Sequence, residues 1–305
     1  MLFATPINKL NLTLNDNVFY IKRDDLLPFC FGGNKARKAE YFLADIKGVG
    51  SDAVVTYGSS SSNHCRIIAN MAAANNLKCY IISPEEDYVE TSNSRMLGLF
   101  GASIIKTPLN SVSDTINKTI KMLEKSCNPY FIPGGGHGNF GTKAYADAYN
   151  EICEQEKELN VNFDYIFLAS GTGTTQAGLV AGRLKRNNLS QQIVGISIAR
   201  RNPYGKQVIL DSLNDYFAND IDYNSDVIFV DKYICEGYGK YNDPILKSVA
   251  DTLISDGIAL NTTYTGKAFW GMKEYLMENK ITKKNILFIN TGGSSLFFDR
   301  LEDIK

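Results

Sequence analysis

Residues 164–178, DYIFLASGTGTTQAG, join an apolar run to a turn rich in glycine and threonine. The run DYIFLA is typical of a buried strand, and residues 174–186 have the composition of a helix. The same alternation of short apolar runs and amphipathic stretches begins at about residue 50. Strands are also predicted at 53–57, 78–83, 102–106, 130–132, 193–198, 227–230 and 286–289, and helices at 63–75, 92–100, 113–125, 143–157, 206–216, 244–256 and 268–279. This order predicts βαβ units around parallel sheets.

A glycine-rich segment, PGGGHGNFG at 133–141, interrupts the alternation. We therefore expect an α/β protein of two lobes, each with a mostly parallel sheet flanked by helices, and a chain crossing between the lobes near this break. The length agrees, because 305 residues correspond to about two domains of roughly 150 residues each.

The composition excludes several classes of protein. Hydrophobic residues make up 44% of the chain, and 32 basic residues balance 33 acidic ones for a net charge of −1. The ordinary hydrophobicity excludes disorder of the whole chain, and the balanced charge argues against a broad basic surface. No apolar run approaches the about 18 residues that span a bilayer, and the N-terminal residues do not resemble a secretory signal. We expect neither a nucleic-acid nor a membrane partner.

The cysteines and histidines argue against disulfides and metal sites. The six cysteines are widely spaced without a CxxC pair, which fits reduced thiols in the cytoplasm. The chain has only two histidines, so a histidine-rich metal site is not expected.

The turn GTGTT, directly after the strand DYIFLA and one serine, has the groups needed to bind an anion. Gly171 and Gly173 allow close approach of the backbone, and the hydroxyls of Thr172, Thr174 and Thr175 can donate hydrogen bonds to phosphate oxygens. No Gly-Lys-Ser/Thr follows, and the third glycine of the dinucleotide fingerprint is missing. The turn therefore fits a single phosphate monoester, the alternative being a tight turn without a ligand.

A second unusual turn, GSSSSNHCR at 58–66, also follows a predicted strand. The plainer interpretation is a helix cap with spare hydroxyls. Capping needs only one such residue, and a run of hydroxyls and an amide at a helix N-terminus is also a natural site for a carboxylate.

Lys35 follows Gly32 and Gly33 at the start of a basic segment that has the pattern of a helix start. Most lysines lie on solvated faces, so this lysine gains meaning only in combination with the two turns. A cup for one phosphate, a polar anion-binding turn and a lysine presented by glycines are the parts that an enzyme using pyridoxal 5′-phosphate requires. The phosphate would anchor the cofactor, Lys35 would form the imine, and the serine-rich turn would hold an amino-acid carboxylate.

Seven short motifs extend this pattern over nearly the whole chain. They are KRDD at 22–25, GGNKARK at 32–38, SNH at 62–64, GTGTT at 171–175, EGYG at 236–239, YTGK at 264–267 and NTGG at 290–293. With these motifs in this order, the chain resembles the fold-type-II pyridoxal-phosphate enzymes, and within them the aminocyclopropane-carboxylate deaminase/D-cysteine desulfhydrase family. The resemblance implies a fold like that of the tryptophan synthase β chain. Residues 1–47 and 140–305 would form the large cofactor-binding domain, and residues 48–139 the small one.

The resemblance also implies roles for the matching residues. Catalytic roles would belong to Lys35, Ser62, Tyr238 and Tyr264. The cofactor would contact Lys35, Asn63, Gly171, Thr172, Gly173, Thr174, Thr175 and Thr291, with Asn63 at the pyridoxal 3′-oxygen and Thr291 near the pyridine nitrogen. The substrate would contact Ser61, Ser62, His64, Tyr238 and Tyr264.

Three positions depart from the deaminases of this family. Thr265 stands where they carry glutamate after the second tyrosine, and His64 stands where they tend to have glutamine. A carboxylate keeps the pyridine nitrogen protonated, and a hydroxyl does so poorly, so the ring is a weaker electron sink. A weaker sink suits β-elimination better than opening of a cyclopropane ring. The third departure is GGGHG at 134–138, from which His137 would either enter the cleft and contact the substrate or bond to backbone as a loop residue.

These observations predict a pyridoxal-phosphate-dependent lyase that acts on a small amino acid by α,β-elimination. A D-cysteine desulfhydrase-like reaction would give pyruvate, ammonia and sulfide. The alternatives are ring-opening deamination of aminocyclopropane carboxylate, β-replacement or racemisation with the same cofactor, and, more distantly, a non-catalytic anion-binding α/β protein. The family resemblance further implies a homodimer.

Overall fold

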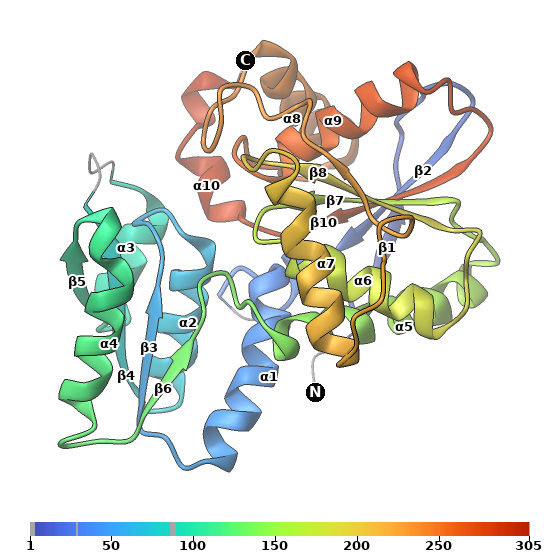
Figure 1. Ribbon diagram of the computed structural model, residues 1–305. Coiled ribbons are helices and arrows are strands. Elements are labelled where there is room, and N and C mark those ends of the chain that lie inside the picture. Colours follow the sequence, from blue (N-terminus) through green and yellow to red (C-terminus); the bar gives the residue numbers. More distant parts are fainter. Residues whose placement is uncertain (1–3, 29, 86–89, 305) are drawn as a thin grey trace.

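The computed structural model describes residues 4–28, 30–85 and 90–304. Two lobes lie side by side, each built around its own sheet, with both termini at the larger lobe (Figure 1). The predicted α/β class with two mostly parallel sheets is confirmed. Among the described residues, no helix combines the length and the apolar character that a membrane span requires.

The larger lobe contains a six-stranded sheet. Its strand order is β1 (Ile7–Lys9), β2 (Val18–Arg23), β10 (Asn285–Asn290), β7 (Tyr165–Ser170), β8 (Gln192–Ser197) and β9 (Ile228–Val230). Only the edge pair β1–β2 is antiparallel, and the other neighbours run parallel. The carboxyl ends of the parallel strands therefore meet at one edge of the sheet, where open α/β proteins bind their ligands.

Helices cover both faces of this sheet, as expected for parallel strands. Ile166 and Leu168 of β7 point to one face, where α5 (Asn139–Leu159), α6 (Thr174–Lys185) and α7 (Tyr204–Phe217) pack. Phe167 points to the other face, toward α8 (Asp243–Asp256) and α9 (Thr265–Glu278). The alternation explains why residues 165–169, YIFLA, lack charged side chains, since both faces of the strand are buried.

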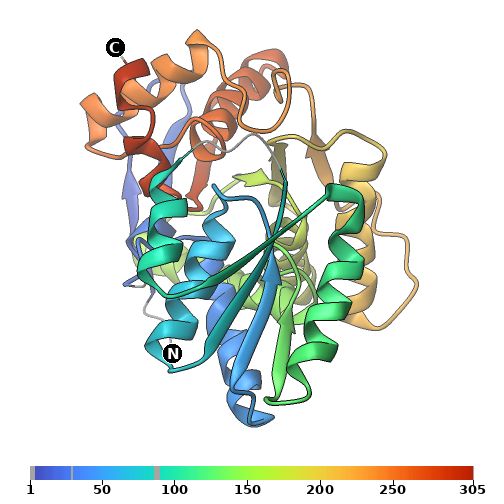
Figure 2. The same cartoon turned by 90° about the vertical axis from the view of Figure 1, so that its left-hand side faces the viewer.

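The smaller lobe contains a four-stranded parallel sheet and faces the viewer in Figure 2. Its order is β5 (Ser103–Thr107), β4 (Lys78–Pro84), β3 (Ala53–Tyr57) and β6 (Pro129–Ile132). One face packs against α1 (Asn34–Gly48), α2 (Asn63–Ala74) and α3 (Ser92–Leu99). The other packs against α4 (Val112–Leu123), through Ile116 and Leu123.

The N-terminal part of the larger sheet was not predicted from the sequence. Strands β1 and β2 and the short helix α10 (Ser294–Phe298) lie outside the predicted elements, and only the start of α1 was recognised. Strand β2 ends in Lys22 and Arg23, which hide its strand character. Lys22 is buried, and its ammonium lies 2.5 Å from a Glu151 carboxylate oxygen, so its charge is balanced inside the fold.

Helix α1 lies between the two lobes (Figure 1). Its residues Ala36, Phe42 and Ile46 belong to the same apolar cluster as α2, and the helix also contacts α5 of the larger lobe. The predicted boundary at residue 47 assigns α1 to the large domain, and this division stays a prediction.

Candidate active site

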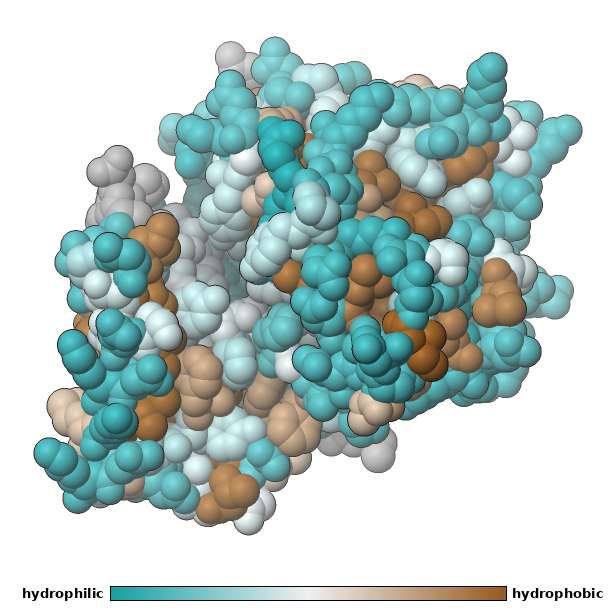
Figure 3. All heavy atoms as spheres, viewed as in Figure 1, coloured by the Kyte–Doolittle hydropathy of each residue, from teal (hydrophilic) through white to brown (hydrophobic). Residues whose placement is uncertain are grey.

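A cavity of about 290 Å³ opens between the two lobes, where the space-filling surface in Figure 3 is hollowed. It is lined by Asn34, Lys35, Tyr57, Gly58, Ser59, Ser62, Asn63, His64, Gly134, Gly135, Ala169, Ser170, Gly171, Thr172, Gly173, Thr175, Gln176, Ile198, Ala199, Arg200, Tyr238, Tyr264, Thr291 and Gly292. Most of these residues follow the carboxyl ends of strands. The described lining has two cationic side chains, Lys35 and Arg200, and no aspartate or glutamate. Such a cavity favours an anionic ligand.

The turn before α6 fits a phosphate. Gly173 directly precedes the helix and has a φ of +88°, which favours glycine. No side chain caps the first N–H groups of the helix. The buried hydroxyls of Ser170 and Thr174 have no hydrogen-bond partner among the described residues. Of these two residues only Ser170 lines the cavity. The unpaired backbone N–H groups at the helix N-terminus are donors that a phosphate accepts from.

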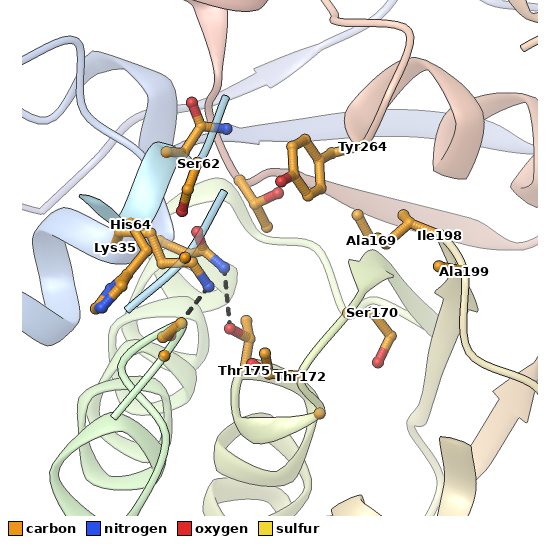
Figure 4. A pocket seen from close by; sticks show the side chains of 18 of the residues that line it. Lys35, Ser62, His64, Ala169, Ser170, Thr172, Thr175, Ile198, Ala199 and Tyr264 are labelled. Atoms are coloured by element: carbon orange, nitrogen blue, oxygen red, sulfur yellow. Dashed lines mark hydrogen bonds between the residues drawn. The ribbon is translucent and has the colours of Figure 1, made fainter. Parts of the chain in front are cut away.

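Gly33 brings the start of α1 close to the loop after β10 and to the cavity. Gly33 has a φ of +98°, and a Cβ on it would lie 2.6 Å from the backbone oxygen of Thr291. The backbone N–H of Asn34 donates to that same oxygen at 3.0 Å. The side chain of Asn34 donates to Thr175 Oγ1 at 3.0 Å (Figure 4). Helix α1, which carries Lys35, is thus hydrogen-bonded to the turn before α6, residues 171–175, which we call the phosphate turn, and to the loop after β10.

Lys35 and Lys38 point to one carbonyl group. Lys35 Nζ donates to the oxygen of Gly135 at 3.1 Å, and Lys38 Nζ donates to it at 3.4 Å. Burial lowers the pKa of Lys35 to about 8. Burial, and then the charge of Lys35, lower the pKa of Lys38 well below its usual value. A lysine with a depressed pKa supplies the neutral amine that attacks a carbonyl carbon.

Sequence reasoning did not single out Lys38. Its side chain is 1% exposed and neighbours Gly136 of the glycine-rich loop. A Cβ on Gly135 would lie 2.7 Å from Thr172, so this loop touches the phosphate turn. The spacing of three residues from Lys35 was the available signal, because such residues share one face of a helix.

The smaller lobe contributes the first turn of α2. Ser62 caps this helix by accepting a hydrogen bond from the Cys65 N–H at 3.3 Å, and Asn63 and His64 follow it along the cavity wall. His64 Nε2 lies 2.8 Å from Thr56 Oγ1, whose proton goes to the Ile132 carbonyl. His64 therefore donates from Nε2. Burial lowers the pKa of His64 well below its usual value, with the Lys35 and Lys38 charges acting in the same direction, and the ring stays neutral.

The larger lobe contributes two tyrosines and a threonine. The phenol oxygens of Tyr238 and Tyr264 lie 2.5 Å apart, with Tyr238 exposed and Tyr264 half-buried. Burial, and then Tyr238, raise the pKa of Tyr264 well above its usual value. Thr291 lines the cavity. Thr265 does not line it, because its hydroxyl accepts hydrogen bonds from the backbone and side chain of Asn261 at 3.0 and 3.1 Å.

Three predicted site residues lie away from the cavity lining. Ser61 accepts a hydrogen bond from Asn93 through its carbonyl, and Thr174 is fully buried. His137 is not part of the cavity lining, so the predicted contact with the substrate is not seen. Its Nε2 lies 3.3 Å from the hydroxyl of Ser212 on α7. The contact with Ser212 could not be predicted from the glycine-rich segment, because nothing in that segment indicates that α7 lies beside it.

Arg200 was also missed by sequence reasoning. It lines the cavity just beyond β8, and its guanidinium lies 5.1 Å from the ring centroid of Tyr204. Its buried Nη1 has no hydrogen-bond partner within the described part of the chain. An arginine that lines a cavity is a further candidate donor for an anion.

Two comparisons cover nearly the whole chain. It is 32% identical to a D-cysteine desulfhydrase from Serratia proteamaculans, over 97% of this chain and 93% of that protein. The crystal structure of an ACC deaminase homologue matches 99% of this chain and 93% of its own, with a TM-score of 0.86 and 29% identity.

A more distant structure shares only the fold. The fungal L-serine ammonia-lyase from Rhizomucor miehei matches 99% of this chain and 98% of its own, with a TM-score of 0.73 at 15% identity. The family described as pyridoxal-phosphate dependent enzyme matches residues 2–292. This match spans most of the chain, and the cavity brings together a lysine of lowered pKa and a turn rich in glycine and threonine. The chain belongs to the family of pyridoxal-phosphate dependent enzymes.

Proposed function

We propose that the protein is a lyase that removes the β-substituent of a small amino acid, with D-cysteine as substrate and pyruvate, ammonia and sulfide as products. The observation that carries this proposal is Lys35, whose amine has a pKa of about 8 and lies in a cavity without a lining carboxylate. The bound cofactor supplies an electron sink for the substrate's α-carbon.

The cofactor contacts that we propose follow from unpaired donors. The N–H groups at the start of α6 and the hydroxyls of Thr172 and Thr175 would hold the phosphate. Lys38, buried without a carboxylate among the described residues, would balance its charge. Asn63 would donate to the 3′-oxygen. Thr291 would face the pyridine nitrogen.

The substrate contacts that we propose come from the opposite wall. Ser62 and the serine-rich turn would receive the α-carboxylate at the N-terminus of α2. Lys35 would take the α-proton, since its lowered pKa matches a general base near neutral pH. Tyr238 and Tyr264 would lie beside the leaving sulfur. One water is consumed overall, and D-cysteine and water give pyruvate, ammonia and sulfide in balance.

Ring-opening deamination of aminocyclopropane carboxylate is the second candidate. It is supported by the 0.86 TM-score to the ACC deaminase homologue. Thr265 argues against it, because no carboxylate replaces the missing glutamate in the described lining of the cavity. A neutral pyridine nitrogen favours a substrate whose leaving group takes the electrons at once.

The test is a panel of D-cysteine, L-cysteine and aminocyclopropane carboxylate, with pyruvate, sulfide and ammonia measured separately. We expect equal amounts of the three products from D-cysteine and slow turnover of the cyclopropane. The Lys35→Ala variant is the control for non-enzymatic sulfide release. Rapid ring opening without sulfide from D-cysteine would replace our proposal by the second candidate.

We also propose a homodimer located in the cytoplasm. The proposal rests on the family resemblance and, for the location, on widely spaced cysteines, all six of which are free thiols. Light scattering of the purified protein tests the oligomeric state. The division into a large domain of 1–47 plus 140–305 and a small domain of 48–139 is proposed on the same basis.

A further inference from the structure

Arg66 is a buried cation without a described carboxylate partner. It lies on α2, one turn after the residues that line the cavity, and is 0% exposed. Its Nη1 donates to Asn93 Oδ1 at 3.0 Å and also to Ser295 Oγ. Its Nε and Nη2 have no hydrogen-bond partner in the described part of the chain. Burying a guanidinium without a carboxylate costs folding free energy. This cost suggests that the hydrogen bonds of Arg66 serve a function.

Those contacts fix which way the Asn93 side chain faces. Arginine can only donate, and Ser295 also donates to Asn93 Oδ1, at 2.7 Å. The amide oxygen of Asn93 must therefore face Arg66. Its amide nitrogen then faces the other way and donates to the Ser61 carbonyl at 2.7 Å and to Asn63 Oδ1 at 2.9 Å.

The same reasoning applies one residue further, to Asn63. Its amide oxygen is engaged by Asn93, so its Nδ2 is the amide atom left for the cavity. This nitrogen lies against the loop after β10, since a Cβ on Gly293 would come within 2.7 Å of it. The chain of contacts from Arg66 through Asn93 thus presents an N–H donor, and not an oxygen acceptor, to the ligand.

We infer that Arg66 is a positioning residue that, together with Ser61 and Ser295, sets the polarity of the Asn63 amide toward the 3′-oxygen of the cofactor. The inference rests on the proposed contact of Asn63 with that oxygen. A donor at this position stabilises the ionised 3′-oxygen, and the buried positive charge of Arg66 acts in the same direction. The Ser61 carbonyl and the Ser295 hydroxyl favour the same orientation of the Asn93 amide, and Arg66 adds a charged donor to them.

Ser295 adds a link between the lobes. Arg66 and Asn93 belong to helices of the smaller lobe, and Ser295 belongs to α10 of the larger lobe. The neighbouring pair Ser92 and Asp299 joins α3 to the chain just after α10, with the Ser92 hydroxyl 2.6 Å from the carboxylate. The orientation of the Asn63 amide is therefore set while the lobes are in contact at this face.

The experiment compares Asn93→Asp and Arg66→Met with the wild-type holoenzyme. The Asn93→Asp change keeps the size of the side chain and pairs with Arg66, but removes both donated hydrogen bonds. Asn63 then turns its nitrogen toward the introduced carboxylate and its oxygen toward the cavity. The readout is the ratio of visible to near-ultraviolet absorbance of the bound cofactor, which reports whether the 3′-oxygen is ionised. Arg95→Met, on the exposed face of α3, is the matched control.

We expect the ratio to fall at least about fivefold in Asn93→Asp, the change that loss of one ordinary hydrogen bond gives. It should fall by a smaller factor in Arg66→Met, where the Ser61 carbonyl and the Ser295 hydroxyl still orient Asn93. Cofactor content, measured after release by acid, should stay at one per chain, and the control should keep the wild-type ratio. An unchanged ratio in folded, cofactor-loaded Asn93→Asp protein would overturn the inference. Failure of the wild-type protein to bind the cofactor through Lys35 would instead overturn the proposed function.

Discussion

Lys35 Nζ and Lys38 Nζ share one hydrogen-bond acceptor, the carbonyl oxygen of Gly135, at 3.1 and 3.4 Å. Neither amine pairs with a carboxylate within the described residues. Two ammonium groups at one carbonyl repel each other, and burial disfavours both charges. The pair therefore prefers a state with at least one neutral amine.

The burial of Lys35 makes the stability of the cofactor-free protein depend on pH. The folded-state pKa of Lys35, about 8, lies below its ordinary value of 10.5. Between these values the unfolded chain binds a proton that the folded chain does not, so stability rises with pH through this window. We expect Lys35→Met to remove up to about 3 kcal/mol of that rise. Urea unfolding at several pH values checks this. A rise that is equal in wild type and variant would contradict the assigned pKa.

Lys38 should gain a proton when the cofactor binds. Burial holds its pKa low in the free protein, and a phosphate dianion nearby would raise it again. We expect the heat of cofactor binding to depend on the ionisation enthalpy of the buffer, and this dependence to shrink in Lys38→Met. Lys143→Met, which removes an exposed lysine of α5, is the control. Equal buffer dependence in the Lys38→Met and Lys143→Met variants would mean that Lys38 does not take up a proton when the phosphate binds.

The two adjacent threonines of α6 should respond differently to substitution by valine. Thr175 Oγ1 lines the cavity and accepts a hydrogen bond from Asn34, whereas the Thr174 hydroxyl is buried without a described partner. We expect Thr175→Val to weaken cofactor retention about tenfold, from loss of a charge-assisted hydrogen bond. Thr174→Val should retain the cofactor and be at least as stable as wild type, because it removes an unsatisfied hydroxyl. Dialysis followed by cofactor quantitation, with thermal unfolding, tests both. The reverse order would assign the phosphate contact to Thr174.

Thr291→Glu should change the reaction more than the binding. A carboxylate beside the pyridine nitrogen would keep it protonated and strengthen the electron sink. We expect more exchange of the substrate α-proton with solvent deuterium for each sulfide released. Thr291→Val controls for loss of the hydroxyl. A constant ratio of exchange to sulfide release in all three proteins would mean that residue 291 does not face the nitrogen.

The strands, and the two polar turns that line the cavity, could be predicted because their signals are local. Strand β3 was predicted with both of its ends, Ala53–Tyr57, since it is apolar and bounded by polar residues. The turns after β3 and β7 were recognised from hydroxyl and glycine content alone. Most of the predicted site residues line one cavity for the reason that carboxyl ends of parallel strands converge.

The other features of the site and fold depend on contacts between residues that are far apart in the sequence, and a local sequence pattern does not reveal such contacts. Lys38 and Arg66 look like ordinary helix cations, and only their burial without carboxylates marks them. The direction of His137 could not be chosen from a glycine-rich loop, and it is Ser212 of α7 that holds the ring outside the cavity lining. Strand β2 was missed because the partner of its buried Lys22 stands on α5, more than a hundred residues away.

Helix α1 stands in the apolar cluster of the smaller lobe, while the phosphate turn belongs to the larger lobe. One ligand molecule attached to Lys35 and bound at the start of α6 would then contact both lobes at once. The affinity for this ligand would therefore depend on how the two lobes are oriented relative to each other. Substitutions on the buried face of α1, at Phe42 or Ile46, would change the affinity for the ligand without touching it.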